Sequence, residues 1–169
     1  MCSEPPYPPV LISAERIALR VSVLGRRIAE DAVGDSPLLV VAVLTGAVFF
    51  CVDLMRAMAG TDVELEFVRA SSYGSKRESS GEIELSALLP RSLAGRRVLV
   101  VEDILDTGHT LARVHEELKL KGAEWVKTAV LLAKPTRVMQ PDYVGFDIDN
   151  RFVVGYGLDD AGRWRNLPY

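Results

Sequence analysis

The most informative part of the sequence is VLVVEDILDTGHTL, residues 98–111. It opens with four apolar residues in a row, which is typical of a strand covered on both faces. A polar loop follows, and then apolar residues at positions 111, 114 and 118, the spacing of one helical face. A buried strand that leads through a loop into a helix is a unit of an α/β sheet.

The same alternation continues on both sides of this stretch. We predict strands at residues 38–44, 63–67, 98–101, 126–133, 143–146 and 152–156, a strand near residues 83–85, and helices beginning at Ser13, after Gly46 and near Leu111. Strands that alternate with helices form a parallel sheet with helices on its faces. With 169 residues, the chain fits one domain. The prediction is a single α/β domain, residues 1–169, with a central, mostly parallel sheet flanked by helices.

Composition and charge exclude several classes of protein. Hydrophobic residues make up 49% of the chain and charged residues 25%, which excludes intrinsic disorder. The net charge of −3 provides no basic field, so we expect no nucleic-acid partner and no membrane partner. The longest uncharged run, residues 38–52, is shorter than the roughly 20 residues that span a bilayer. A polyanionic ligand would therefore need a local binding device.

The cysteines and the first residues indicate the compartment. Cys2 lies in a proline-rich start and Cys51 in an apolar segment, so the two form no disulfide framework. The opening MCSEPPYPPV lacks the basic and apolar regions of a secretion signal. We therefore expect a cytoplasmic protein.

Polar residues gather where the predicted strands end, and ligands of parallel sheets bind at that edge. Glu102 and Asp103 follow the strand at 98–101, where solvation is poor and like charges repel. Such a pair could accept hydrogen bonds from ribose hydroxyls, help to hold Mg²⁺ through its waters, or both. The next loop presents backbone N–H groups and hydroxyls at the start of a helix. We predict a phosphate monoester site formed by Asp106, Thr107, Gly108, His109 and Thr110.

Five segments together resemble a known family. VVEDILDTGHTL resembles the phosphoribosyl pyrophosphate signature of the type I phosphoribosyltransferases. The segments LTGAVFF, SSYGS, LLAKPTR and YVGFDIDNRFVVGYGLDDAGRWRNLPY resemble the hypoxanthine-guanine branch, and they occur in the family's order. The resemblance implies the type I fold, with a flexible lid hairpin at about residues 71–81. It also implies a small hood formed largely by the C-terminal segment, with residues 134–169 binding the base.

The resemblance implies a purine-salvage enzyme that uses Mg²⁺. The implied reaction transfers the 5-phosphoribosyl group from phosphoribosyl pyrophosphate to N9 of hypoxanthine or guanine, and gives IMP or GMP and pyrophosphate. Family members form dimers or tetramers, so we expect a homodimer or homotetramer. Relatives continue past the position of Tyr169 with a short apolar stretch, so a few residues are expected to be absent.

The resemblance also implies roles for single residues. Asp106 matches the proposed general acid/base near purine N7. Lys134 matches the lysine that donates to purine O6; an ammonium has no acceptor for the amino group of adenine, so adenine should be rejected. Phe152 matches the aromatic that stacks on the base, and Val153 the residue whose backbone binds the base edge. The implied metal residues are Glu102, Asp103 and Asp159, with Asp159 at the second magnesium.

The remaining matches concern pyrophosphate and the lid. Thr45 and Gly46 occupy the pyrophosphate loop, where the family often has a non-proline cis peptide, and Arg165 matches the arginine that meets pyrophosphate. Many relatives carry lysine in place of Thr45, so that side-chain contact is not carried over, whereas the Gly46 amide is. Ser72 and Tyr73 match lid residues that close over the reacting centre and exclude water.

Other interpretations stay open on the sequence. Taken singly, Lys134 and Asp159 could be surface charges and Phe152 a core side chain. The base could be xanthine, because Lys134 would serve any 6-oxopurine. A regulator that senses phosphoribosyl pyrophosphate and binds nucleic acid would need a basic face or an added domain, which the net charge of −3 disfavours. The joint occurrence of five segments in order favours the enzyme.

Overall fold

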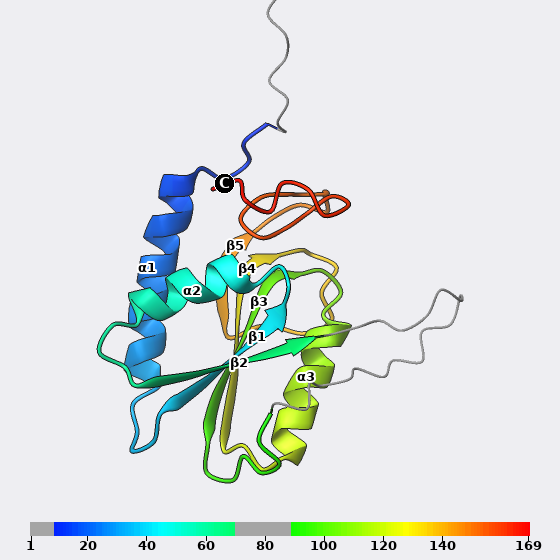
Figure 1. Cartoon of the computed structure of the whole chain (residues 1–169). Helices are drawn as coiled ribbons and strands as arrows, with labels where there is room; N and C mark the ends of the chain where they lie inside the picture. Colours follow the sequence, from blue (N-terminus) through cyan, green and yellow to red (C-terminus); the bar gives the residue numbers. More distant parts are fainter. Residues whose placement is uncertain (1–8, 70–88) are drawn as a thin grey trace, which may run out of the picture.

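A parallel sheet organises the part of the chain that the computed structural model describes, residues 9–69 and 89–169 (Figure 1). The elements are α1 (Ala14–Asp31), β1 (Leu38–Leu44), α2 (Val48–Ala57), β2 (Val63–Arg69), β3 (Arg97–Leu105), α3 (His109–Leu120), β4 (Trp125–Ala133) and β5 (Tyr143–Asp147). The strand order is β2-β1-β3-β4-β5, and each neighbouring pair is parallel. The predicted α/β class and its parallel sheet are confirmed.

Helices cover both faces of the sheet, α1 and α2 on one and α3 on the other (Figure 1). β1 shows why both faces need cover: Leu38, Val40 and Ala42 belong to the core under α1 and α2. The alternate residues, Leu39, Val41 and Val43, belong to the core under α3. An uninterrupted apolar run is therefore what this central position requires.

α1 begins where the sequence predicts, because the Ser13 hydroxyl accepts a hydrogen bond from the Arg16 N–H at 3.4 Å. Its predicted apolar face is buried, and comprises Ile17, Val21, Leu24 and Ile28. Burial of each such side chain contributes about 1.5–3 kcal/mol to stability. On α3 the buried positions are Leu111, Val114 and Leu118, again as the spacing predicts.

Two predicted boundaries are wrong. β3 does not end before Glu102 but continues to Leu105, because β4 keeps pairing with it as far as the Leu105 and Ala133 pair. The loop is correspondingly short, residues 106–108, and His109 lies in the first turn of α3. Glu102 and Asp103 thus lie on a paired strand rather than after it.

The predicted strand at 152–156 is also wrong. This segment forms only an isolated bridge between Gly155 and Leu158. Three consecutive residues have left-handed backbones: Gly155 at φ 96°, Tyr156 at 48° and Gly157 at 104°. A strand cannot pass through such residues, so the chain turns back over the carboxyl end of the sheet (Figure 1).

Other predictions fall outside the described residues, namely the lid at 71–81 with Ser72 and Tyr73, and the strand near 83–85. Within residues 9–69 and 89–169, no helix has the length and apolar character needed to cross a membrane.

Candidate active site

The connections of the sheet change direction between β1 and β3. β1 leads into α2 on one face of the sheet and β3 leads into α3 on the other, so the two connecting loops diverge. In sheets of this type, ligands bind outside the carboxyl ends of the strands at such a point. Gly46 of the loop after β1 and Asp103 of β3 meet there.

The loop after β1 lies directly against β3. The Leu44–Thr45 peptide is cis and non-proline, as the resemblance implies. Gly46 is buried, and a Cβ atom on it would lie 1.6 Å from Oδ2 of Asp103. This close approach follows from the parallel pairing of Ala42 with Val101, which brings the ends of the two strands side by side. Only glycine leaves room for the carboxylate.

The carboxyl groups on β3 are in a setting that disfavours their charge. Burial, assisted by the charge of Asp103, raises the pKa of Glu102 to about 8. Burial also raises the pKa of Asp103, against the hydrogen bond that its carboxylate accepts from the Ile104 N–H at 2.9 Å. Perturbed acids in a crevice are characteristic of functional sites. A cation or a polyol at this position would relieve the unfavourable charge.

The predicted phosphate loop opens α3. Gly108 precedes the helix with φ 89°, and a Cβ there would crowd Leu105 and Met139 at 3.0 and 3.1 Å. The first intrahelical bond runs from the Ala112 N–H to the Gly108 carbonyl at 2.9 Å. The N–H groups of residues 109–111 therefore have no acceptor within the helix, and Gly108 supplies no side-chain cap. They face the end where an anion is stabilised by the helix dipole.

Asp106 and Lys134 meet because their strands are neighbours. Each follows the last residue of its strand, and Leu105 pairs with Ala133. The Lys134 ammonium donates to Oδ2 of Asp106 at 2.8 Å, and the Thr136 hydroxyl donates to Oδ1 at 3.0 Å. These two donors hold the pKa of the Asp106 carboxyl below its usual range. An exposed carboxylate is thus kept ionised and oriented.

Arg165 and Asp159 lie in the C-terminal segment and form an ion pair of 2.5 Å. Arg165 also donates to the Gly157 carbonyl at 2.5 Å. Gly157 packs on the loop after β1, because a Cβ on it would lie 2.0 Å from the Gly46 carbonyl oxygen. The charges of Arg165 and Asp159 both act on the Asp103 carboxyl. The structure therefore brings Gly46, Asp103, Asp159 and Arg165 together.

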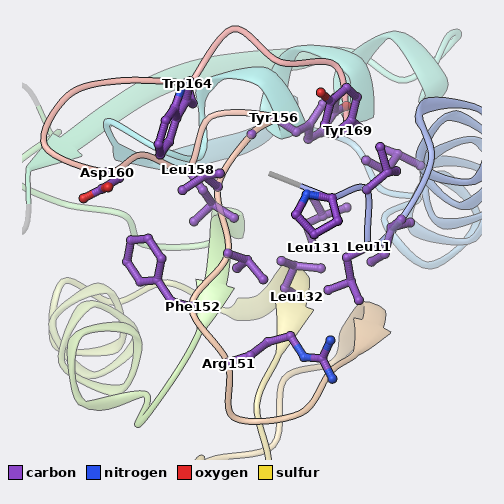
Figure 2. Close-up of a pocket in the computed structure, with 17 residues that line it drawn as sticks. Leu11, Leu131, Leu132, Arg151, Phe152, Tyr156, Leu158, Asp160, Trp164 and Tyr169 are labelled. Atoms are coloured by element: carbon purple, nitrogen blue, oxygen red, sulfur yellow. The ribbon is translucent and has the colours of Figure 1, made fainter. Parts of the chain in front are cut away.

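Phe152 and Val153 line an apolar cavity of about 430 Å³ under the C-terminal segment. Figure 2 shows the Phe152 ring on one side of its chain segment, toward α3, and Leu11, Leu131 and Leu132 on the other side. The ring is 74% exposed, so it is not a core side chain. Asp106 and Lys134, which follow β3 and β4, do not line this cavity.

Sequence reasoning missed three contributors to the site. Thr136 belongs to LLAKPTR, two residues after Lys134, but its bond to Asp106 depends on the tertiary structure. Tyr156 is the last residue of the segment predicted to be a strand, 152–156, and Gly157 directly follows that segment. The three acidic residues expected to bind metal are only partly gathered, since within the described ranges no three Asp, Glu, His or Cys side chains converge as a ready metal site.

A parallel sheet whose carboxyl edge carries an open helix N-terminus and perturbed carboxyl groups is typical of α/β proteins that bind phosphorylated ligands. Residues 14–161 match the phosphoribosyl transferase domain. The chain belongs to that family.

Individual relatives agree with this assignment. The chain is 41% identical over 163 residues to the hypoxanthine-guanine phosphoribosyltransferase of Streptococcus thermophilus, covering 95% of this chain and 89% of that protein. It is 44% identical over 163 residues to the bifunctional protein TilS/HprT of Listeria innocua; this covers 95% of this chain but only 25% of that longer protein. A crystal structure of a hypoxanthine-guanine phosphoribosyltransferase from Bacillus anthracis superposes with a TM-score of 0.86 at 38% identity, covering 96% of each chain.

Proposed function

We propose that this chain is a purine-salvage phosphoribosyltransferase, which transfers the 5-phosphoribosyl group from phosphoribosyl pyrophosphate to N9 of hypoxanthine or guanine. The observation that carries the proposal is the Asp106 carboxylate, bonded to Lys134 and placed next to the open N-terminus of α3. A 5-phosphate on that helix end would set the sugar beside Asp106. Relatives named hypoxanthine-guanine phosphoribosyltransferase support the choice of base.

In this proposal the two sides of the site hold the two ends of phosphoribosyl pyrophosphate. Residues 106–110 bind the 5-phosphate through backbone N–H groups and the hydroxyls of Thr107 and Thr110. The amide of Gly46 and the guanidinium of Arg165 bind the pyrophosphate, which leaves with an added negative charge. Glu102 and Asp103, between these groups, accept hydrogen bonds from the ribose hydroxyls. Thr45 contributes backbone rather than a charge.

Asp106 acts as the general acid/base at N7 of the purine. Its carboxylate is ionised and oriented by Lys134 and Thr136, as a proton acceptor requires. Lys134 has three donor protons, so it can bond Asp106 and purine O6 at once. The Phe152 ring stacks on the base and the Val153 backbone binds its edge. Ser72 and Tyr73 would exclude water, which otherwise hydrolyses the activated sugar.

Magnesium fits the carboxyl groups of this site. Mg²⁺ retains waters and binds one or two protein carboxylates together with substrate phosphates, so it needs no cage of three side chains. The perturbed carboxyl groups of Glu102 and Asp103 would hold one ion by the ribose, and Asp159 would bind a second by the pyrophosphate. When bound, the metal neutralises charge on the leaving pyrophosphate. We also propose a homodimer or homotetramer in the cytoplasm.

The proposal is tested by turnover of the purified chain with phosphoribosyl pyrophosphate, Mg²⁺ and four bases in parallel. We expect nucleotide formation with hypoxanthine and guanine, none with adenine, and loss of all turnover when a chelator removes Mg²⁺. Turnover with xanthine alone would identify the alternative substrate, because Lys134 serves every 6-oxopurine. Lack of turnover with each 6-oxopurine would contradict the proposed function.

The Lys134→Gln variant tests how the base is recognised. We expect kcat/KM for hypoxanthine and guanine to fall about 10-fold, because a charged hydrogen bond to O6 is lost. Discrimination against adenine should also weaken, since an amide can accept from an amino group. The measurement is kcat/KM for the three bases. Lys127→Gln is the control, because Lys127 forms a similar ion pair with Asp142 at 2.7 Å outside the site. Unchanged base selectivity would show that O6 is bound by another group.

A further inference from the structure

Tyr156 makes a hydrogen bond that the proposed reaction does not use. Its side chain is almost fully buried, with 8% exposure, and its hydroxyl donates to Oδ2 of Asp53 at 2.7 Å. Its ring also contacts that of Phe49, with centroids 6.3 Å apart. Both partners lie on α2, whereas Tyr156 lies in the C-terminal segment, 103 residues further along. The contact joins two parts of the chain that only the fold brings together.

Both residues of this hydrogen bond are close along the chain to residues of the candidate site. α2 follows the Thr45–Gly46 loop, so Asp53 is part of the helix that this loop begins. Tyr156 precedes Gly157, whose N–H donates to the Arg165 carbonyl at 2.9 Å and whose own carbonyl accepts from the Arg165 guanidinium. The Tyr156 N–H donates to the Leu167 carbonyl at 2.7 Å. This bond holds the segment that carries Arg165 against the turn at Tyr156.

We propose that Tyr156 is a positioning residue for pyrophosphate, because its bond to Asp53 fixes the segment that carries Asp159 and Arg165 against the Thr45–Gly46 loop. This inference rests on the proposed function. Pyrophosphate would be held from two sides, by the Gly46 amide and by Arg165, and the spacing between those sides depends on the Tyr156 contact. Burial and the Asp53 carboxylate raise the pKa of Tyr156, so the hydroxyl remains a donor.

Tyr156 has a left-handed backbone, at φ 48°, so the conformational preference of the residue itself does not stabilise this turn. Bulky residues rarely adopt this conformation, so tertiary contacts must maintain it. Without the hydroxyl, the Asp53 carboxylate loses its buried donor and the turn loses a link to α2. The segment would then sample positions in which Arg165 is displaced from the Gly46 loop. The base, which contacts other residues, would be affected much less.

The test compares Tyr156→Phe with Tyr143→Phe. Tyr143 is a matched control: it is 2% exposed, and its hydroxyl donates to Oδ2 of Asp31 at the same distance, 2.7 Å. That bond joins β5 to the end of α1, on parts of the fold that hold none of the proposed site residues. Both variants remove one part-buried tyrosine–aspartate hydrogen bond and keep the ring. A loss of stability alone would therefore appear in both.

We expect Tyr156→Phe to raise the KM for phosphoribosyl pyrophosphate, and for pyrophosphate in the reverse reaction, about 10-fold, the factor that corresponds to one lost hydrogen bond. The KM for hypoxanthine should change less than about twofold, and Tyr143→Phe should retain all three values. Asp53→Asn keeps an acceptor oxygen, so its KM for phosphoribosyl pyrophosphate should be closer to that of the natural chain than the KM of Asp53→Ala.

Two results would overturn the inference. One is a Tyr156→Phe enzyme whose KM for phosphoribosyl pyrophosphate is that of the natural chain. The other is an equal change in Tyr143→Phe, which would mean that the effect is one of stability. Failure of the proposed function is distinguishable, because the unsubstituted chain would then turn over no 6-oxopurine at all.

Discussion

The Asp106→Asn enzyme is expected to turn over about 100-fold more slowly than the natural chain, with little change in the KM for phosphoribosyl pyrophosphate. The amide keeps the shape of the carboxyl group; its single oxygen can still accept from the Lys134 ammonium, and its NH2 group can donate to the hydroxyl oxygen of Thr136. It cannot take up or release a proton near neutral pH. Loss of kcat with unchanged substrate binding is the sign of a group that acts mainly in the transition state.

The measurement is steady-state kinetics over a range of pH. Because Lys134 and Thr136 lower the pKa of Asp106, the natural enzyme should keep its activity until the pH approaches the acidic range, where protonation removes the base. The Asn enzyme should lack this acidic limb. Asp142→Asn is a matched control, since Asp142 also bonds a lysine and a threonine, Lys127 at 2.7 Å and Thr128 at 3.1 Å. An Asp106→Asn enzyme with normal turnover would remove Asp106 from the acid/base role.

Gly46→Ala is expected to reduce kcat/KM for phosphoribosyl pyrophosphate by about 100-fold or more, which corresponds to about 2.7 kcal/mol of lost transition-state binding. The added methyl group would lie 1.6 Å from Oδ2 of Asp103, so either the loop or the carboxylate must move. Both belong to the proposed binding site, one for pyrophosphate and the other for ribose and Mg²⁺. The KM for phosphoribosyl pyrophosphate should change strongly, and the KM for the base much less.

Gly60→Ala serves as the control for this variant. Gly60 has φ 95°, so alanine there costs stability, but a Cβ atom would have no neighbour within 4 Å. Thermal unfolding of both variants, measured beside kcat/KM, separates loss of fold from loss of site. A Gly46→Ala enzyme that binds phosphoribosyl pyrophosphate normally would show that the Asp103 carboxylate can move away without consequence.

The core of the sheet could be predicted from the sequence because its cause is local. Residues 38–44 and 129–133 are continuous apolar runs, and only strands covered on both faces need them. The Ser13 cap and the spacing of Val114 and Leu118 likewise belong to single segments. In the site, a glycine before a helix within a polar loop was enough to predict that α3 begins there with an open N-terminus.

The remaining features depend on pairing between distant segments. Glu102 and Asp103 have the polar character of a loop, but pairing with β4 keeps them in β3. The ion pair of Asp106 with Lys134 follows from that same register, which no local pattern reveals. Tyr156 has a strand-forming sequence around it, yet the bond to Asp53 and neighbouring glycines impose a turn. Such contacts decide the positions of functional groups.

The ion pair between Arg165 and Asp159 has a consequence for how ligands enter. An anion arriving by itself would draw Arg165 away and leave Asp159 uncompensated, and a divalent cation arriving by itself would do the reverse. Once the pair is broken, each of the two side chains has an oppositely charged partner only if the anion and the cation arrive together. If Arg165 and Asp159 bind pyrophosphate and Mg²⁺ as proposed, two new ion pairs replace their mutual one, which favours uptake of the pyrophosphate group together with the metal ion over uptake of either alone.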